Sequence, residues 1–406
     1  MADQALSDLR VVDISQGIAG PYATKLLADS GAAVTKVEPP AGDYSRRLGP
    51  FPNDVPDSEK SGLYLHLNTS KRSITLDVSV ASGQVVLKKL LANADVFVCG
   101  EKTSALRSWG LSYDDLKDAY PELVVAQVSP FGATGPYADY DGNSLTAMAI
   151  SSIMYNTGDP DREPLTTGGE PAEYIAGVHL WIGILAAIEN RAAHRGGDHV
   201  DVSIAEAAAV SDEYNAAMYA FQGAVRRRYY SRHIFGYPND IIQAADGYFV
   251  LIPGAGGFPT PLTGDSISPM SLLMENPEFD QSPLFKQMGE RMINWREFDE
   301  LLKPYLESHS VQEIVMTAQA LRMPFAFVPD ANDLLTSDHL AERGFFATVD
   351  TNAGPMRVPG APFKMSETPL RASPPPTRGE ANKSVLVDDL GYETEDLTVL
   401  SDRGVT

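Results

Sequence analysis

The residues that could do chemistry are few, and the first of them is a carboxylate. Glu173 is the third residue of a long apolar helix expected from about Pro171 to Arg191. A carboxylate can attack an activated acyl group as a nucleophile, or it can merely complement the positive end of the helix dipole, worth about 0.3–1 kcal/mol. The nearby acids Glu170 and Asp161 are expected to be solvated loop residues. The residues alone leave both roles of Glu173 open.

Basic residues near the expected strands are the second group. Lys71 and Arg72 come directly before an apolar strand, and Arg46 follows a Gly-Asp pair. The chain has 54 acidic and 32 basic residues, so a local basic cluster is harder to explain by solubility alone. Such residues could capture the phosphates of an anionic small molecule. Three arginines at 226–228 are expected to form a solvated helix end, with an acidic substrate as the alternative.

Composition excludes several classes of protein. A net charge of −22 argues against a general binder of nucleic acids or anionic membranes. Cys99 is the single cysteine, so a disulfide within the chain is impossible, a cysteine-based zinc site is not expected, and Cys99 should be a small buried hydrophobe. The first ten residues lack the layout of a signal peptide, and glycines and His179 interrupt the apolar stretch 174–188. We therefore expect a cytoplasmic protein without a metal, with His179 in a helix core.

Alternating strands and helices must position these residues. The expected strands are Arg10–Ile14, Ala33–Val37, Ile74–Val78, Val96–Cys99 and Leu123–Ser129, with helices over Pro21–Ser30, 81–91 and 113–119. This alternation predicts an α/β fold with a parallel sheet, whose ligands sit beyond the carboxyl ends of the strands. No glycine-rich dinucleotide motif or P-loop follows a strand, so a nucleotide redox cofactor is not expected.

The remaining chain predicts a second, smaller domain. Helices are expected over 144–154 and 205–221, a strand over 200–204, a hairpin at Asp246-Gly247 and mostly helices over 283–342. The glycine run 254–257 is expected to be a plain turn, and 369–380 is a proline-rich connector. We therefore expect a large domain over 1–224, a small α+β domain over 225–335, and a connector with a helical return to the large domain over 336–406.

An ordered set of motifs resembles the class III CoA-transferases, a group that includes formyl-CoA and carnitine–CoA transferases and acyl-CoA racemases. The set covers most of the chain from residue 6 to about 405. It comprises Leu6–Ser15, Ala19-Gly20-Pro21, Leu27–Ala32, Lys36–Pro39, Gly42-Asp43-x-x-Arg46, Asn68-x-x-Lys71-Arg72-Ser73-Ile74, Phe131-Gly132-x-x-Gly135-Pro136-Tyr137, Ala245–Tyr248 and Leu390-Gly391-Tyr392.

The resemblance implies a fold and a chemistry. Family members have a Rossmann-like large domain built from both ends of the chain, a smaller domain between them, and two chains interlocked as a dimer. Their nucleophile is an Asp at the start of a buried helix, followed four residues later by Gly. Here Glu173 and Gly177 take those places. Glu is about 1.5 Å longer, and a misplacement on that scale can cost about 10²-fold in rate.

The resemblance also implies a CoA site. Arg46, Lys71 and Arg72 match family positions near CoA. The usual segment after the fourth strand is replaced here by Cys99–Ser104, and a basic family position falls on Ser108. We expect Lys102 or Arg107 to make the CoA contacts that the family residues at these positions make. Coenzyme A is then a substrate and product, with no metal and no nucleotide redox cofactor.

These observations lead to one expected function and two alternatives. We expect an enzyme that moves CoA from an acyl-CoA to a free carboxylic acid, with Glu173 as nucleophile and Gln16, Gly17 and Gly135 lining the site. The turn at Gln16-Gly17 could equally be structural. One alternative is a catalytically altered subunit that supports an active partner chain, so a heterodimer stands beside the expected homodimer. The other is a racemase, which is disfavoured because its His would fall at Tyr140.

Overall fold

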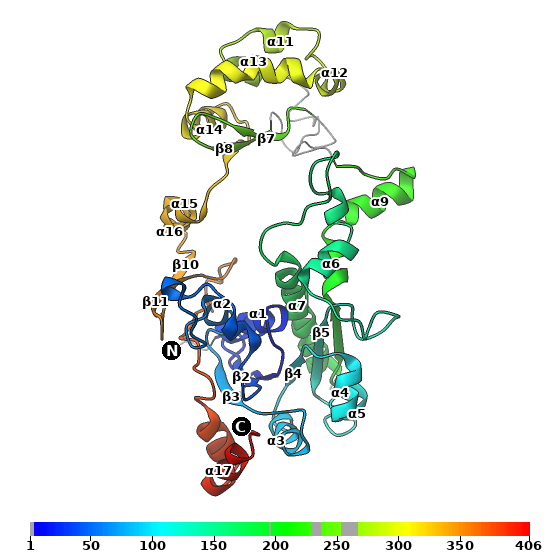
Figure 1. The fold of residues 1–406 in the computed structure, drawn as a ribbon, viewed down its shortest axis with the longest axis vertical. Coiled ribbons are helices and arrows are strands. Elements are labelled where there is room, and N and C mark those ends of the chain that lie inside the picture. Colours follow the sequence, from blue (N-terminus) through cyan, green and yellow to red (C-terminus); the bar gives the residue numbers. More distant parts are fainter. Residues whose placement is uncertain (1–3, 195, 229–236, 253–266) are drawn as a thin grey trace. The chain divides into compact units, whose positions relative to one another are not determined.

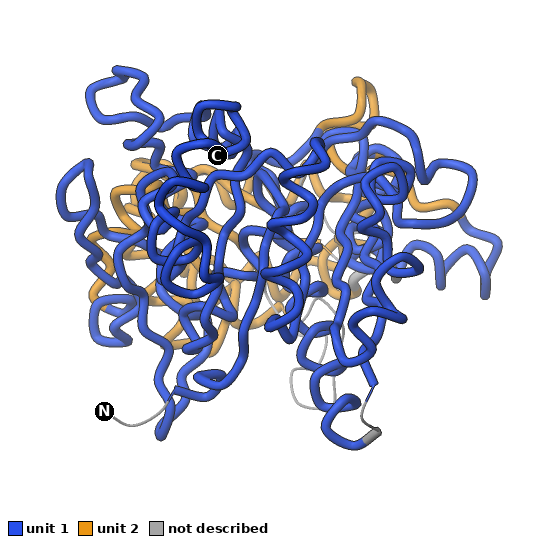
Figure 2. Tube along the Cα trace, turned by 90° about the horizontal axis from the view of Figure 1, so that it is seen from below, with its two compact units in different colours: residues 1–154, 166–224, 339–406 blue, residues 155–165, 225–338 orange. Residues whose placement is uncertain are grey.

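A computed structural model describes residues 4–194, 196–228, 237–252 and 267–406, which form two compact units (Figure 2). The first comprises Met1–Met154, Thr166–Ala224 and His339–Thr406, and the second comprises Tyr155–Leu165 and Val225–Asp338. The sequence placed the domain limits at 224 and 335. The second unit therefore ends three residues later than expected, and it also includes a segment from the middle of the large domain.

A six-stranded parallel sheet forms the centre of the first unit (Figure 1). Its spatial order is β3-β2-β1-β4-β5-β6. The strands are β1 (Arg10–Asp13), β2 (Ala33–Glu38), β3 (Arg72–Thr75), β4 (Val96–Cys99), β5 (Val124–Ser129) and β6 (His199–Ser203). This is the doubly wound order of Rossmann-like folds, so the expected fold class is confirmed. The direction of winding changes between β1 and β4.

Alternate residues of the strands build two hydrophobic cores on opposite faces of the sheet. Val96 and Val98 belong to one core, whereas Phe97 and Cys99 belong to the other. The first core packs against helices α1 (Ala19–Asp29), α6 (Ser144–Ile150), α7 (Pro171–His194) and α8 (Ile204–Val210). The second packs against α3 (Ala81–Leu91), α4 (Thr103–Trp109), α5 (Tyr113–Leu116) and the C-terminal segment. Cys99 is fully buried, as expected.

Helix α7 begins where the sequence predicts and extends three residues beyond the expected end at Arg191. By length and composition alone, Pro171–Ala193 could cross a membrane, whereas the interruptions by glycines and His179 predict a buried helix of a globular core. Its buried residues Ala172, Ala176, Leu180 and Ile184 recur every four residues and pack against the sheet core. This spacing is that of an amphipathic helix covering a sheet. His179 is exposed, so its expected place in the core is wrong.

The C-terminal segment lies at the edge of this sheet. The backbone amide of Ala381 donates to Ser73 O (2.9 Å), and that of Asp77 donates to Val405 O (2.7 Å). The segment contains a short π-helix (Ser384–Asp389) and α17 (Thr394–Asp402). The sequence missed an antiparallel hairpin, β10 (Phe346–Thr351) with β11 (Gly354–Pro359). The first unit also contains α2 (Gly62–Leu67) and α9 (Glu213–Gln222), so the helix expected over 205–221 is two helices.

The second unit has its own core of helices against a small sheet. Strands β7 (Asp240–Gln243) and β8 (Tyr248–Leu251) pair through the expected turn, and β9 (Ala326–Phe327) joins β8. The helices are α10 (Ser268–Leu273), α11 (Glu278–Gln281), α12 (Met288–Ile293), α13 (Trp295–Ser308), α14 (Val311–Ala320) and α15 (Ala331–Thr336), while α16 (Asp338–Glu342) straddles the boundary. Arg228 fixes the segment 155–165 by donating to the carbonyls of Tyr155 (2.9 Å) and Asp159 (3.0 Å).

Candidate active site

The change of winding between β1 and β4 creates the crevice in which such sheets hold ligands. The loop after β1 contains Gln16 and Gly17, and the loop after β4 contains Glu101 and Lys102. A cavity of about 140 Å³ lies at these strand ends. Its lining includes Gln16, Pro39, Leu76, Glu101 and Trp109. The structure thus places Gln16 at the ligand-binding edge of the sheet.

Glu173 lies in the first turn of α7, beside the start of α1. Its Oε2 accepts a hydrogen bond from the backbone amide of Ala19 at 3.3 Å. The two helix starts meet because residue 177 is glycine: a Cβ there would lie 2.6 Å from Ala19 O and 3.2 Å from the ring of Tyr22. Gly177 is therefore a packing requirement, and the carboxylate four residues earlier is brought to the loop after β1.

Glu173 is only weakly compensated. Burial raises the pKa of its carboxyl above the usual value, the Ala19 amide opposes this effect, and the charge of Glu170 adds to it. The side chain is half-buried, whereas Glu170 is exposed. A carboxylate with a raised pKa is more basic and hence a stronger nucleophile once it is ionised.

The loop after β1 rests on a buried ionic network. Asp13 accepts from the amide of Ser15 (2.9 Å) and the hydroxyl of Thr24 (2.6 Å). Lys36 forms an ion pair with Asp43 (2.8 Å) and donates to Ser15 O. All five side chains are buried. This buried network therefore holds the loop after β1 in place before any substrate binds.

Asp43 engages the backbone amide of Gly17, a residue expected to line the site. The Gly17 amide donates to Asp43 Oδ1 at 3.1 Å, and the amide of Tyr44 donates to Gln16 Oε1 at 3.3 Å. Gly17 has a φ of +81°, which glycine adopts without strain. The sequence missed both the Ala19 amide and Tyr44. Tyr44 is the first unspecified residue of the Gly42-Asp43-x-x-Arg46 motif. Its place in that motif is the sequence signal that could have pointed to it.

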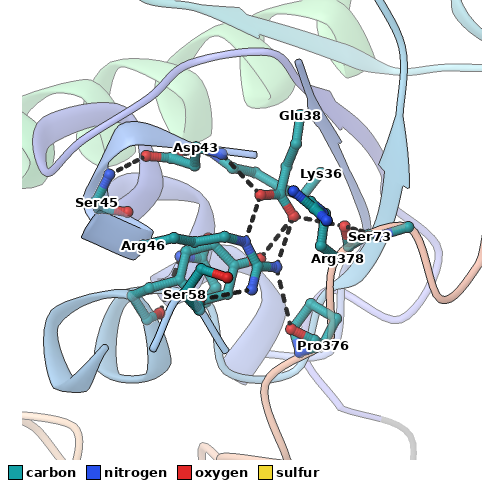
Figure 3. A network of polar contacts seen from close by, with 12 residues as sticks. Lys36, Glu38, Asp43, Ser45, Arg46, Ser58, Ser73, Pro376 and Arg378 are labelled. Atoms are coloured by element: carbon teal, nitrogen blue, oxygen red, sulfur yellow. Dashed lines mark hydrogen bonds and ion pairs between the residues drawn. The ribbon is translucent and has the colours of Figure 1, made fainter. Parts of the chain in front are cut away.

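Arg46 is a buried structural tie in this structure (Figure 3). Its guanidinium donates to Glu38 through Nε (2.7 Å) and Nη2 (2.8 Å) and to Glu59 through Nη1 (2.9 Å). It also lies over the ring of Tyr64, 3.6 Å from the centroid. Arg46 is 1% exposed. Its guanidinium is paired with carboxylates of the chain and is buried, so it is not exposed to bind CoA.

Lys71 and Arg72 are also engaged with the chain's own groups. Lys71 is buried and donates to Pro21 O (2.9 Å) and Asn68 Oδ1 (2.8 Å), and burial lowers its pKa to about 7. Arg72 opens β3 and pairs with Asp389 at 3.0 Å. Since β3 is parallel to the other strands, its first residue lies at the amino edge of the sheet, opposite the ligand edge. Arg72 therefore lies at the edge opposite the ligand crevice, whereas Lys71 lies 3.6 Å from Asp13 in the buried network beneath the loop after β1.

Of the basic residues expected to contact CoA, Lys102 and Arg107 are the two that follow the carboxyl end of β4. Lys102 Nζ pairs with Asp141 Oδ1 (2.7 Å) and donates to Asp139 O (2.9 Å), which joins the loops after β4 and β5. Arg107 is exposed in the last turn of α4. Gly135 is exposed in the loop after β5, with a φ of +87°.

The other candidates add no catalytic group. Tyr140 is 57% exposed and stacks on Tyr137 at 4.9 Å. Residues 254–257 lie outside the described residues. Within the described ranges, no cluster of three or more His, Cys, Asp or Glu side chains could hold a metal ion.

Comparison with known proteins connects this geometry to a family. Residues 6–382 match the profile of CoA-transferase family III. The chain is 31% identical over 401 residues to the succinyl-CoA:(R)-benzylsuccinate CoA-transferase subunit BbsE of Thauera aromatica, covering 96% of this chain and 95% of that one. It is 30% identical to the succinyl-CoA:mesaconate CoA-transferase of Haloarcula marismortui over 98% and 99% of the two chains. A CAIB/BAIF family protein from Brucella suis superposes with a TM-score of 0.84 at 25% identity, covering 95% and 99%.

Proposed function

The chain belongs to CoA-transferase family III and is a CoA-transferase, and we propose that Glu173 is the nucleophile by which it moves CoA from an acyl-CoA to a free carboxylic acid. The observation that carries this proposal is the under-compensated carboxylate at the start of α7. Its raised pKa and its contact with the loop after β1 are what an acyl-accepting carboxylate needs.

The proposed reaction begins at the thioester carbon. A Glu173 oxygen bonds to that carbon, the carbon–sulfur bond breaks, and CoA leaves as a thiolate, which gives a mixed anhydride. The thiolate then attacks the glutamyl carbonyl and releases the donor acid. The acceptor carboxylate displaces CoA from that carbonyl, and the thiolate finally attacks the acceptor's acyl carbon. One thioester replaces another, so the overall reaction consumes neither ATP nor a reductant.

CoA would approach through the crevice at the carboxyl ends of β1 and β4. The cavity beside Gln16 and Trp109 has the expected place in the fold. Lys102 and Arg107 follow β4, so we propose them as the phosphate-binding residues in preference to the buried Arg46 and Lys71 and the distant Arg72. Gly135 would line the approach from the loop after β5.

Similar proteins suggest a donor. The relatives from Thauera and Haloarcula carry succinyl-CoA in their names, so succinyl-CoA is the donor we propose to test first. We also propose a cytoplasmic homodimer. The test is transfer of radiolabelled CoA from succinyl-CoA to a panel of carboxylic acids by the isolated chain. Glu173→Gln should reduce transfer by at least about 10³-fold while CoA binding persists.

A matched variant separates the chemistry from side-chain length. Glu173→Asp keeps the carboxylate but shortens its reach by one methylene. Activity retained or raised in this variant, together with an inactive Glu173→Gln, supports a carboxylate nucleophile. Unchanged turnover in Glu173→Gln would remove Glu173 from the mechanism.

A second candidate is a subunit that supports an active partner chain. The relative from Thauera is named as a subunit, and a Chloroflexus aurantiacus relative, 29% identical, is named as the beta subunit of a succinyl-CoA–L-malate CoA-transferase. Transfer that appears only after a second, Asp-bearing chain is added, and that survives Glu173→Gln, would favour this candidate.

A further inference from the structure

The hydroxyl of Tyr44 lies directly against the loop that reaches Glu173. A Cβ built on Gly17 would lie 1.8 Å from Tyr44 Oη and 2.5 Å from its Cζ. The phenol therefore fills the space that any side chain at residue 17 would need. The backbone holds this arrangement, because the Tyr44 amide donates to Gln16 Oε1 and the preceding Asp43 accepts from the Gly17 amide.

The same hydroxyl is within electrostatic reach of Glu173. Burial raises the pKa of Tyr44, and among the charges around it Glu173 contributes most, followed by Asp43 and Glu170. The phenol therefore keeps its proton across the working pH range and remains a hydrogen-bond donor. The residue is still 42% exposed, so part of its side chain is open to solvent.

Two of the backbone donors nearby are already engaged. The Gly17 amide is bonded to Asp43, and the Ala19 amide is bonded to Glu173. Attack on a thioester places negative charge on the acyl oxygen, and such charge requires a positioned donor. Among the described residues beside Glu173, the Tyr44 hydroxyl is a donor that faces the loop and whose proton no recorded hydrogen bond uses.

We propose that Tyr44 is a catalytic residue that donates a hydrogen bond to the acyl oxygen when Glu173 attacks the thioester. This inference rests on the proposed function. As the Glu173 oxygen bonds to the acyl carbon, the carbonyl π pair moves to oxygen, which accepts from Tyr44 O–H without taking its proton. The pair then returns, the carbon–sulfur bond breaks, and CoA leaves as a thiolate.

The test is Tyr44→Phe, with Tyr140→Phe as the matched control because Tyr140 is also exposed and lies outside this contact. Tyr44→Phe should lower kcat by about 10²-fold, while KM for the acyl-CoA and the thermal midpoint stay close to wild type. Replacement of Tyr44 by 3-fluorotyrosine retains the hydroxyl and should restore kcat to within about threefold. Tyr140→Phe should leave kcat unchanged.

Two results would overturn the inference. One is a kcat within about threefold of wild type for Tyr44→Phe, and the other is an equal loss in the fluorotyrosine variant. Neither result bears on Glu173, whose own variants decide the proposed function. An inactive Glu173→Gln together with a fully active Tyr44→Phe would refute the role of Tyr44 and leave the role of Glu173 intact.

Discussion

Two glutamates in the first unit occupy opposite kinds of surroundings. Glu38, at the end of β2, is fully buried and accepts from Arg46, Tyr64, Ser73 and the amide of Asp43. These partners lower its pKa to about 2 against the effect of burial. Glu173, at the start of α7, accepts from one backbone amide, and burial raises its pKa.

The difference shows how one side chain serves structure in one place and chemistry in another. Around Glu38 every lone pair has a partner, so the ionised group holds together segments that are far apart in sequence. Around Glu173 burial is left largely uncompensated, and the ionised form retains free energy that bond formation can release. The two regions should therefore respond in opposite ways to the same substitution.

The largest effect on stability is expected from Glu38→Gln. The neutral amide leaves the buried Arg46 guanidinium without its main partner, which should lower the free energy of unfolding by about 3–5 kcal/mol. Urea unfolding measures this change. The control is Arg72→Ala, which breaks an exposed pair with Asp389 and should cost no more than about 1 kcal/mol. Equal losses in the two variants would contradict the role given to the Glu38 network.

Acid should expose the same network in the wild-type protein. The folded pKa of Glu38 lies below its ordinary value of 4.5, at about 2. Its contribution is therefore complete above pH 4.5 and is lost as the pH falls toward 2, by about 3 kcal/mol in total. Urea titrations at several pH values should show this loss, and Glu38→Gln should flatten it. An unchanged slope in the variant would assign acid sensitivity to other groups.

Glu173→Gln should behave in the opposite way. The folded pKa of Glu173 is raised, so the folded state binds this proton more tightly than the unfolded state, and ionisation costs stability at neutral pH. The amide removes that cost and can still accept from the Ala19 N–H. We expect the free energy of unfolding to stay unchanged or to rise by up to about 1 kcal/mol. A clear loss of stability would mean that Glu173 is a structural residue.

The smallest expected effect concerns pH dependence. The charge of Glu170 helps to raise the pKa of Glu173, and the nucleophile must be ionised. The acid limb of kcat/KM should therefore lie above pH 4.5 in the wild type, and Glu170→Gln should move it downward by about 0.3 pH units. Glu163→Gln is the control, because Glu163 is an exposed acid that pairs with Arg162. A limb that moves upward in Glu170→Gln would contradict this electrostatic link.

The local pattern of apolar residues predicted the strands of the sheet. It did not predict which groups surround the charged side chains. Apolar runs predicted the strands at 96–99 and 124–129 because both faces of a doubly wound sheet are buried. Arg46 and Lys71 are predicted to bind CoA because they are basic and match family positions near CoA, and neither signal reveals that they are buried. Their burial depends on partners that only the folded chain brings together, including Glu38, Asp13 and the carbonyl of Pro376.

The segment 155–165 and the backbone donors of the loop after β1 show the same limit. Residues 155–165 join the second unit where Arg228, some seventy residues later, binds their carbonyls. Likewise, the meeting of Ala19 with Glu173 depends on the packing of α1 against α7 at Gly177. Neither the contact of Arg228 with the segment 155–165 nor that of Ala19 with Glu173 can be inferred from the positions of these residues in the chain.

The most direct measurement is chemical trapping of the acyl-enzyme. The chain would be incubated with isotopically labelled succinyl-CoA, treated with hydroxylamine, digested and analysed by mass spectrometry. We expect a hydroxamate on Glu173 that requires the thioester and is absent from Glu173→Gln. Active enzyme that forms no adduct at residue 173, or that forms one at another carboxylate, would contradict the claim that Glu173 receives the acyl group.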